Sequence, residues 1–268
     1  MADFVTLERP SEGVALVTMS NPAINNHGSW KGIGELAAAM KDAREAGTRV
    51  TVLASGVPGH WFEHAWLQDL ADGIEGKPTT GAGMAWYNAL FEIGKTDVVT
   101  IAAVSGDCSG GGAELGWACD LRIAEEQALF GQPEVQIALT TGIGGTSRVA
   151  RLIGRTATAE LVMLGRPFTA RRVYELGGVN RVVPAGTSVA VALDWARELA
   201  ARPAKALATL KQILNGNDDL SLTDALSNEQ RLFQSVATTP EAMQTMRSIQ
   251  ARFDAGESIR SVYGLPKD

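Results

Sequence analysis

Cysteine is scarce in this chain of 268 residues, and that scarcity narrows the classes of protein to which it can belong. Cys108 and Cys119 are the only two, which argues against the disulfide framework that stabilises small secreted domains. Their spacing is not that of a metal site either, so we expect no bound metal. A reducing compartment, the cytoplasm, is the simplest location for such a chain.

Long apolar runs and clusters of positive charge are also missing. No apolar run reaches about 18 residues, so the sequence predicts no membrane-spanning helix and no membrane partner. The first residues, MADFVTLERPSEG, contain neither an apolar signal core nor an Arg-rich amphipathic pattern. The formal net charge is −6, from 24 basic and 30 acidic residues, which argues against nucleic acid as the main partner.

What is present is an alternation of strand-like runs and helical patterns. Short apolar runs rich in Val, Ile and Thr predict three buried strands and two weaker ones, at 14–19, 50–54, 98–104, 121–124 and 181–183. A helix is predicted at 30–46, with Ser29 as its cap and Gly47 as its stop. Thr169 and Gly177 bound a second helix in the same way. Strands that alternate with helices indicate an α/β fold.

The composition changes after about Pro184, where helical periodicity replaces the alternation. We therefore expect an α/β core at 1–187 and a helical region at 188–268. Apolar stripes in that region are typical of a core or a subunit interface, and they comprise Leu210, Ile213 and Leu214, then Leu232, Phe233 and Val236. The segment 71–85, rich in Gly, Thr and Pro, is predicted to be a mobile loop.

Residues 105–134 carry the features that indicate chemistry. Three glycines, Gly110–Gly112, open an apolar stretch with a single carboxylate, Glu114, and a second carboxylate, Glu134, follows a Gln-Pro pair. Consecutive glycines before a helix leave backbone N–H groups approachable, which suits an anion. An acid among apolar residues needs a partner or a catalytic task. The pattern predicts an oxyanion hole beside two acid/base carboxylates.

The same stretch resembles the signature region of the enoyl-CoA hydratase/isomerase (crotonase) superfamily. The resemblance rests on SGDCSGGGAELGWACDLRIAEEQALFGQPEVQIALTTGIGGTSRVARLIG and continues through GRPFTARRVYELGGVNRVVP. MSNPAINN and VTVLASG are similar to the first two strands of that family. The resemblance implies a crotonase-like spiral of ββα units with a C-terminal helical region. It also implies acyl-CoA thioester substrates, no cofactor besides the coenzyme A of the substrate, and trimers or dimers of trimers.

Functional residues follow from the resemblance position by position. Gly111, at a helix start, corresponds to one N–H donor of the oxyanion hole. Aligning Ala65-Trp66-Leu67 with the usual Ala-Asp-Leu makes Ala65 the second donor. Glu114 and Glu134 correspond to the two glutamates of the hydratase subgroup.

Substrate contacts are implied for Gly110, Glu63, His64 and Trp66, with the Glu63 backbone facing the adenine. Two of these positions depart from the family pattern, since His64 replaces a usual glycine and Trp66 replaces a usual aspartate. We expect Trp66, with the segment 71–90, to shape the acyl pocket. The usual basic residue before the first proline is Asn21 here, which leaves the phosphate contacts of coenzyme A unassigned.

The function that these features predict is hydration of an enoyl-CoA thioester through an enolate held in the oxyanion hole. A first alternative keeps the fold and changes the reaction to double-bond isomerisation or hydrolysis of a carbon–carbon bond. Isomerisation requires only one acid, so the presence of two glutamates favours hydration, whereas His64 supports the hydrolase. A second alternative is a non-catalytic or RNA-binding homologue, which the acidic net charge opposes.

Overall fold

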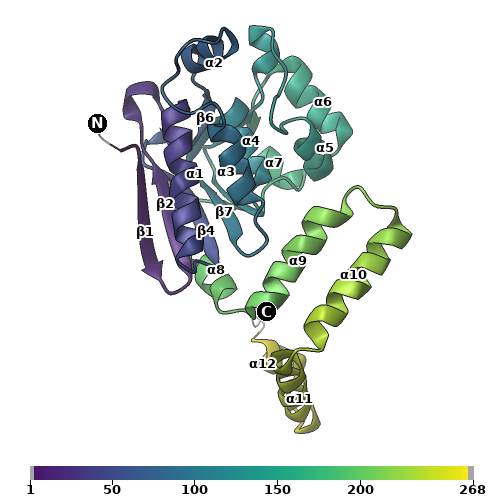
Figure 1. The fold of residues 1–268 in the computed structure, drawn as a ribbon. Coiled ribbons are helices and arrows are strands. Elements are labelled where there is room, and N and C mark those ends of the chain that lie inside the picture. The colour runs from purple at the N-terminus through teal and green to yellow at the C-terminus, as the bar shows by residue number, and fades with distance from the viewer. Residues whose placement is uncertain (1–2, 265–268) are drawn as a thin grey trace. The chain divides into compact units, whose positions relative to one another are not determined.

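Six strands form the central sheet, in the order β1-β2-β4-β7-β9-β12, in a computed structural model that describes residues 3–264 (Figure 1). They are β1 (Val5–Ser11), β2 (Val14–Met19), β4 (Val50–Ser55), β7 (Val99–Val104), β9 (Leu121–Glu125) and β12 (Arg181–Val183). β1 and β2 pair antiparallel, and the other neighbours pair parallel. Every residue of β7 is buried, as expected for a central parallel strand covered on both faces.

A second sheet of four short strands, in the order β11-β10-β8-β5, accompanies the first. Its members are β5 (Gly59–His60), β8 (Gly106–Ser109), β10 (Leu129–Gly131) and β11 (Phe168–Thr169), and a separate pair joins β3 (His27–Gly28) to β6 (Glu63–Ala65). β4, β7 and β9 of the central sheet are each followed by a short strand of the second sheet and then by helix, with β6 standing between β5 and α2. This repeat of two strands and a helix is the arrangement that the resemblance predicted.

Helices cover the sheets and frame the pocket described below. In the first part of the chain they are η1 (Pro22–Ile24), α1 (Trp30–Glu45), α2 (Leu67–Ile74), α3 (Ala85–Ile93), α4 (Gly110–Ala118), η2 (Glu134–Ile137), α5 (Ser147–Ile153), α6 (Arg155–Leu164), α7 (Ala170–Glu175) and α8 (Ser188–Ala200). The helix ends follow the sequence signals. Ser29 accepts a hydrogen bond from Gly32 N and Thr169 accepts one from Arg172 N, so both predicted caps are confirmed.

The chain divides after Ala204 into two compact units. The second contains α9 (Ala204–Asn217), α10 (Leu222–Ala237), α11 (Pro240–Asp254) and α12 (Ile259–Tyr263). This division differs from the boundary expected after residue 187, because α8 packs against β2, β4, β7 and β9 with Ala192 and Ala196 fully buried. Residues 265–268 of the expected helical region lie outside the described residues. Within 3–264, no helix is long and apolar enough to cross a membrane.

Candidate active site

At each of the three glycines that begin α4, a different neighbouring residue occupies the space that a side chain would need. A Cβ atom on Gly112 would lie 2.1 Å from the carbonyl oxygen of Phe62, and one on Gly111 would lie 2.9 Å from Cη2 of Trp86. Gly110 adopts a left-handed φ of 47°, and a Cβ there would lie 2.6 Å from that of His64. Glycine is therefore required at all three positions. Because glycine has no side chain, the first turn of α4 can pack directly against β6.

The N-terminus of α4 has no side-chain cap. Ser109, at the capping position, instead donates from Oγ to Oε2 of Glu63 at 2.5 Å and accepts from the N–H of His64 at 3.2 Å. The first N–H groups of a helix have no partner inside the helix, and they form its positive end. The N–H of Gly111 belongs to this turn, and Gly111 lines the adjoining pocket.

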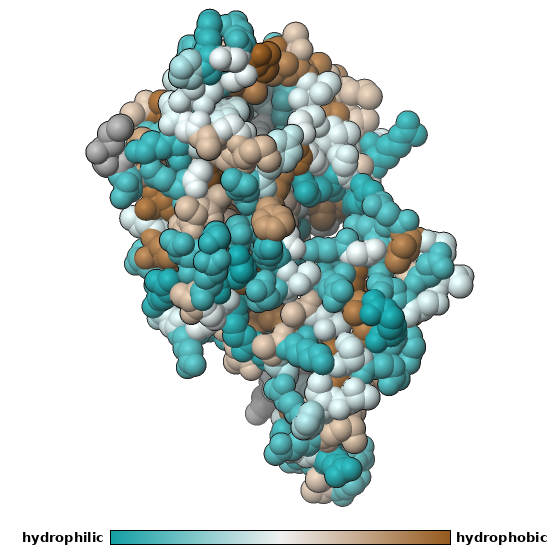
Figure 2. Space-filling model, viewed as in Figure 1, coloured by the Kyte–Doolittle hydropathy of each residue, from teal (hydrophilic) through white to brown (hydrophobic). Residues whose placement is uncertain are grey.

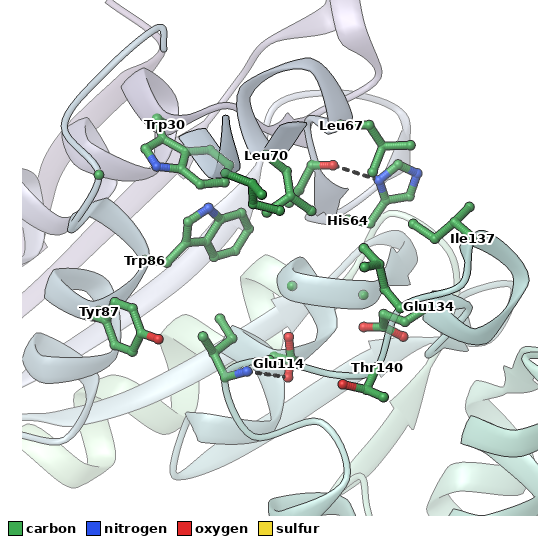
Figure 3. Close-up of a pocket in the computed structure, with 18 residues that line it drawn as sticks. Trp30, His64, Leu67, Leu70, Trp86, Tyr87, Glu114, Glu134, Ile137 and Thr140 are labelled. Carbon is green, nitrogen blue, oxygen red and sulfur yellow. Dashed lines mark hydrogen bonds between the residues drawn. The ribbon is translucent and has the colours of Figure 1, made fainter. Parts of the chain in front are cut away.

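A pocket of about 320 Å³ lies beside this turn (Figure 3). Its walls are mostly apolar, and the residues that line it are Trp30, His64, Ala65, Leu67, Leu70, Ile74, Gly83, Trp86, Tyr87, Gly110, Gly111, Glu114, Glu134, Ile137, Leu139, Thr140, Gly142 and Ile143. In Figure 2, hydrophobic side chains gather at the top of the view, beside α2. The pocket brings together six of the residues selected from the sequence: Ala65, Gly110, Gly111, Glu114, Glu134 and His64.

Glu114 is held by backbone donors from the turn that precedes α5. The N–H groups of Ile143 and Gly145 both donate to its Oε1, at 2.9 Å and 2.6 Å, and the side chain is 3% exposed. Hydrogen bonds from N–H groups to a carboxylate are stronger than those between neutral groups. Among the described residues, no donor is assigned to Oε2, which remains for a molecule in the pocket.

Glu134 faces the same pocket from η2, in a different environment. Burial raises the pKa of Glu134 to about 7, opposed by a hydrogen bond from its own backbone and assisted by the negative charge of Glu114. With its amide oriented so that the oxygen accepts from Nε1 of Trp117 at 3.1 Å, Gln132 donates to Oε1 of Glu134 at 2.8 Å. Gln132 is fully buried and therefore holds the Glu134 carboxyl in one orientation.

Of the residues proposed from the loop after β4, Ala65 and Trp66 differ in their relation to the pocket. Ala65 lines the pocket, whereas the N–H of Trp66 donates to the carbonyl oxygen of Gly28 at 3.0 Å. The ring of Trp66 lies 6.0 Å from that of His27 and is not among the residues that line the pocket. The role of Trp66 in shaping the acyl pocket therefore stays a prediction, and the contact that the structure gives its ring is with His27 of β3.

Glu63 also lies outside the pocket. Its carboxylate is buried and accepts hydrogen bonds from Ser109 and from Nδ1 of His60, which lies 2.9 Å from Oε1. Its backbone N–H donates to the carbonyl oxygen of Asn26 at 3.2 Å. The Glu63 side chain therefore joins the end of β8 to the loop after β4.

Asp69 on α2 fixes the segment between α2 and α3. Its Oδ1 accepts from the N–H of Thr80 at 2.7 Å, and its Oδ2 accepts from the hydroxyl of Thr80 and from the N–H of Trp30 at 2.8 Å. The side chain is 2% exposed. The segment expected to be a mobile loop is thus anchored at its middle, and it contributes Ile74 and Gly83 to the pocket.

Comparison with known proteins agrees with this geometry. Residues 9–253 match the enoyl-CoA hydratase/isomerase family. The chain belongs to the enoyl-CoA hydratase/isomerase family. A probable mitochondrial enoyl-CoA hydratase of Dictyostelium discoideum is 31% identical over 235 residues, which cover 88% of this chain and 84% of that relative. A similar protein of Arabidopsis thaliana is 30% identical, with coverages of 90% and 81%.

Solved structures of this family share the fold. An enoyl-CoA hydratase from Bacillus anthracis matches with a TM-score of 0.83 and 25% identity, covering 93% of this chain and 96% of its own. Another from Thermoplasma volcanium matches with a TM-score of 0.81 and 27% identity, covering 92% and 97%. The predicted family and crotonase-like fold are therefore confirmed.

Sequence reasoning missed three positions that support the site. Asp69 sits in an ordinary helical pattern, and its role depends on Thr80, which the sequence does not place beside it. Gln132 carries no signal of its own in the sequence beyond preceding Pro133. Its position two residues before Glu134 nevertheless lets its amide reach the Glu134 carboxyl. The glycine-rich turn at 142–145 holds Glu114 through two N–H groups, a contact between segments that are distant in sequence.

Gly112→Ala should disrupt the site through the contact between α4 and β6. The new Cβ would meet the backbone of Phe62 and Glu63, which cannot move aside as a side chain can. We expect a loss of about 2–3 kcal/mol in the free energy of unfolding, measured by urea titration. In the same helix, Gly116→Ala places its Cβ 3.0 Å from the ring of Trp61 and gains helix propensity, so it should cost less. Equal losses in both variants would contradict the special role of Gly112.

Proposed function

We propose that the pocket hydrates enoyl-CoA thioesters, and the observation that carries this proposal is the meeting of Glu114, Glu134 and the first turn of α4 in one pocket. The thioester carbonyl accepts hydrogen bonds from the N–H groups of Gly111 and Ala65. Addition of water at the β-carbon then places negative charge on that oxygen as an enolate. Donors that are fixed in advance stabilise this charge, and loss of one typically lowers the rate ~10²–10³-fold. The positive end of α4 adds to the effect.

The second donor is assigned to Ala65 because its neighbour is already occupied. Trp66 donates its N–H to Gly28, so it is not available to a thioester. Ala65 follows in the chain from His64, and both line the pocket. The contact of Gly112 with the 62–63 backbone supports the pairing of the two donors, because it holds α4 beside β6.

The two carboxyl groups divide the proton transfers between them. Glu134, whose pKa burial raises to about 7, is suited to deliver a proton to the α-carbon. Glu114 accepts two N–H donors on one oxygen and presents the other to the pocket, where it orients water and receives its proton. Different environments for two similar groups are a common basis for separate acid and base roles. The reaction as proposed uses no metal or redox cofactor.

The C–C hydrolase alternative loses support from the surroundings of His64. Its Nδ1 lies 2.8 Å from the carbonyl oxygen of Ala65, and its Nε2 lies 3.1 Å from that of His27. With both ring nitrogens engaged, His64 is not poised as an additional base toward the substrate.

A homotrimer, alone or as a dimer of trimers, is the proposed assembly, and a reducing cytoplasm is the proposed location. The second unit exposes large apolar side chains among hydrophilic ones (Figure 2). They include Leu214, Leu222, Phe233 and Ile259. Among the described residues, Cys108 and Cys119 are buried and form no disulfide, which agrees with a reducing compartment.

Assembly through these helices should be visible in sedimentation. Obligate interfaces are large and apolar, and the exposed side chains of the second unit provide such a surface. We expect a species with at least three times the mass of the 28.3 kDa chain, at micromolar concentration. A stable monomer would contradict the proposed assembly.

Replacing each glutamate tests the proposed function directly. Gln keeps the shape of Glu but cannot exchange a proton, so Glu114→Gln and Glu134→Gln should each fold, bind a thioester and lose at least about 100-fold in hydration rate. The losses should not add in the double variant, because the two groups act on one water and one substrate. Hydration of crotonyl-CoA, followed by absorbance, measures the rates. A Glu134→Gln enzyme that turns over like the parent would exclude the assigned mechanism.

The raised pKa of Glu134 predicts an alkaline limb in the pH–rate profile. The carboxyl pair must hold one proton, so kcat/KM should fall as the pH rises through about 7. Hydration releases no net proton, and its equilibrium constant is independent of pH. Dehydration of the product should therefore show the same limb. Profiles measured in both directions check this, and a forward rate that stays constant to about pH 8.5 would rule out Glu134 as the acid.

The pocket lining predicts a preference for uncharged acyl groups. Its charged residues are Glu114 and Glu134, and no Lys or Arg is among the lining residues. A carboxylate on the acyl chain would lie beside two carboxyl groups with no Lys or Arg to pair with it. We expect kcat/KM for crotonyl-CoA or an aromatic enoyl thioester to exceed that for 2,3-dehydroadipyl-CoA at least tenfold.

Ile74, at the pocket edge and 74% exposed, offers a matched test of that preference. Ile74→Lys should raise the relative rate with 2,3-dehydroadipyl-CoA, whereas Ile74→Gln, of similar polarity but uncharged, should not. A partly matching protein of Escherichia coli, 35% identical over 141 residues that cover 53% of this chain, is a 2,3-dehydroadipyl-CoA hydratase. Equal parent activity on both substrate classes would contradict the prediction.

A further inference from the structure

The three histidines of the chain lie on three short strands, and one of them, His64, lines the pocket. His27 belongs to β3, His60 to β5 and His64 to β6. The Nε2 atoms of His27 and His64 lie 3.1 Å apart, with ring centroids at 4.3 Å and ring planes at 78°. His60 instead pairs with the carboxylate of Glu63. His27 and His64 therefore form a pair that is distinct from the third histidine.

The other nitrogen of each ring fixes where the hydrogens are. Nδ1 of His27 lies 2.5 Å from the carbonyl oxygen of Ile24, and Nδ1 of His64 lies 2.8 Å from that of Ala65. A carbonyl oxygen can only accept, so each Nδ1 carries a hydrogen. A neutral imidazole has one N–H, and both Nε2 atoms are then acceptors. If both rings were neutral, the lone pairs of the two Nε2 atoms would face each other across 3.1 Å and repel.

One additional proton resolves this conflict. We propose that His27 and His64 hold a single proton between their Nε2 atoms, and that this shared proton positions the Ala65 segment of the pocket. With one proton, the contact becomes a charge-assisted N–H···N hydrogen bond, and all four ring nitrogens are satisfied. With two protons, like charges would lie 3.1 Å apart. The geometry therefore selects the singly protonated pair.

A bound metal ion is the competing explanation for two converging Nε2 atoms. Histidines that bind metals also donate their other N–H to carbonyl oxygens. A stable site needs further ligands, however, and across residues 3–264 no group of three or more His, Cys, Asp or Glu side chains is arranged to hold a metal. The shared proton needs no third ligand, so the observations favour it.

The surroundings act on the proton in both directions. Burial lowers the pKa of His27 and the neighbouring His64 and His60 also oppose its charge, whereas the bond to Ile24 and the carboxylate of Glu63 favour it. Titratable groups on the elements around β3 and β6 are His60, Glu63, Asp107, Glu114 and Glu134. The ring of Trp66, 6.0 Å from that of His27, is within reach of a cation–π interaction. The proton is held at low pH and released as the pH rises.

The position of the pair connects the proton to catalysis, and this step rests on the proposed function. β3 and β6 pair with an irregular register, and Gly28 aligns with Ala65. Two bonds cross this junction nearby, from Glu63 N to Asn26 O and from Trp66 N to Gly28 O. The shared proton adds a third link, and His64 Nδ1 connects it to Ala65. Loss of the proton removes that link and loosens the segment that carries the proposed oxyanion donor.

Histidine NMR on the intact ¹⁵N-labelled protein tests the shared proton without reference to activity. Three imidazoles are few enough for assignment by single variants, and His60→Gln identifies the ring outside the pair. We expect His27 and His64 to be Nδ1–H tautomers when neutral, and to titrate in two steps separated by more than about one pH unit. Nε2–H tautomers, or independent single steps, would overturn the proposal. A change in the Nε2 resonances when EDTA removes a metal would also overturn it, in favour of a metal site.

Two substitutions of His27 test the positioning role. His27→Gln retains a neutral amide donor toward Nε2 of His64, whereas His27→Phe keeps an aromatic ring without one. We expect His27→Phe to lower kcat about tenfold with little change in KM, and His27→Gln to recover most of that loss. Equal losses in the two variants would show a packing role and overturn this part. Because the NMR result needs no turnover, failure of the shared proton and failure of the hydratase assignment give different outcomes.

Discussion

The approach of α4 to the backbone of β6 is the contact on which the site depends. It requires Gly112, since any side chain there would meet Phe62 and Glu63. The other end of the helix is held by Arg122, which is buried and donates to the carbonyl oxygens of Gly116 and Cys119 at 3.2 Å and 2.5 Å. A cation is favourable at the carbonyl end of a helix. With both ends fixed, the first turn of α4, with Gly110 and Gly111, is held at the wall of the pocket.

This fixed helix gives two chemically identical carboxyl groups different properties. Glu114 lies in the second turn of α4 and meets two N–H groups of the turn before α5. Glu134 comes from a separate segment, and its carboxyl accepts from the Gln132 amide and from its own backbone. Burial raises the pKa of Glu134 to about 7, within the range where a general acid works best. The two carboxyl groups therefore differ in their surroundings, because backbone N–H groups hold Glu114 whereas burial and a side-chain amide act on Glu134.

Much of this arrangement was predictable from the sequence where local patterns are strong. β2, β4 and β7 are continuous apolar runs, and the caps at Ser29 and Thr169 have the expected partners. The second sheet was not predictable, because its strands have only two to four residues and show no periodicity. The two glutamates and the glycine run came from the local pattern, and a family resemblance added Ala65 and the individual roles. The places of Asp69 and Trp66 depend instead on contacts with Thr80 and His27 that are distant in sequence.

The departures from the family pattern become intelligible once they are seen together. His64 stands where the family usually has glycine, and Trp66 where it usually has aspartate, and the side chains of both lie against His27. A histidine in place of glycine needs space, which the left-handed Gly110 provides beneath it. It also needs partners for two ring nitrogens, which Ala65 and His27 supply. His27 can satisfy the Nε2 atom of His64 only when a proton is added to the pair. The presence of His64 and Trp66 at the junction of β3 and β6 therefore also brings a positive charge to the wall of the pocket.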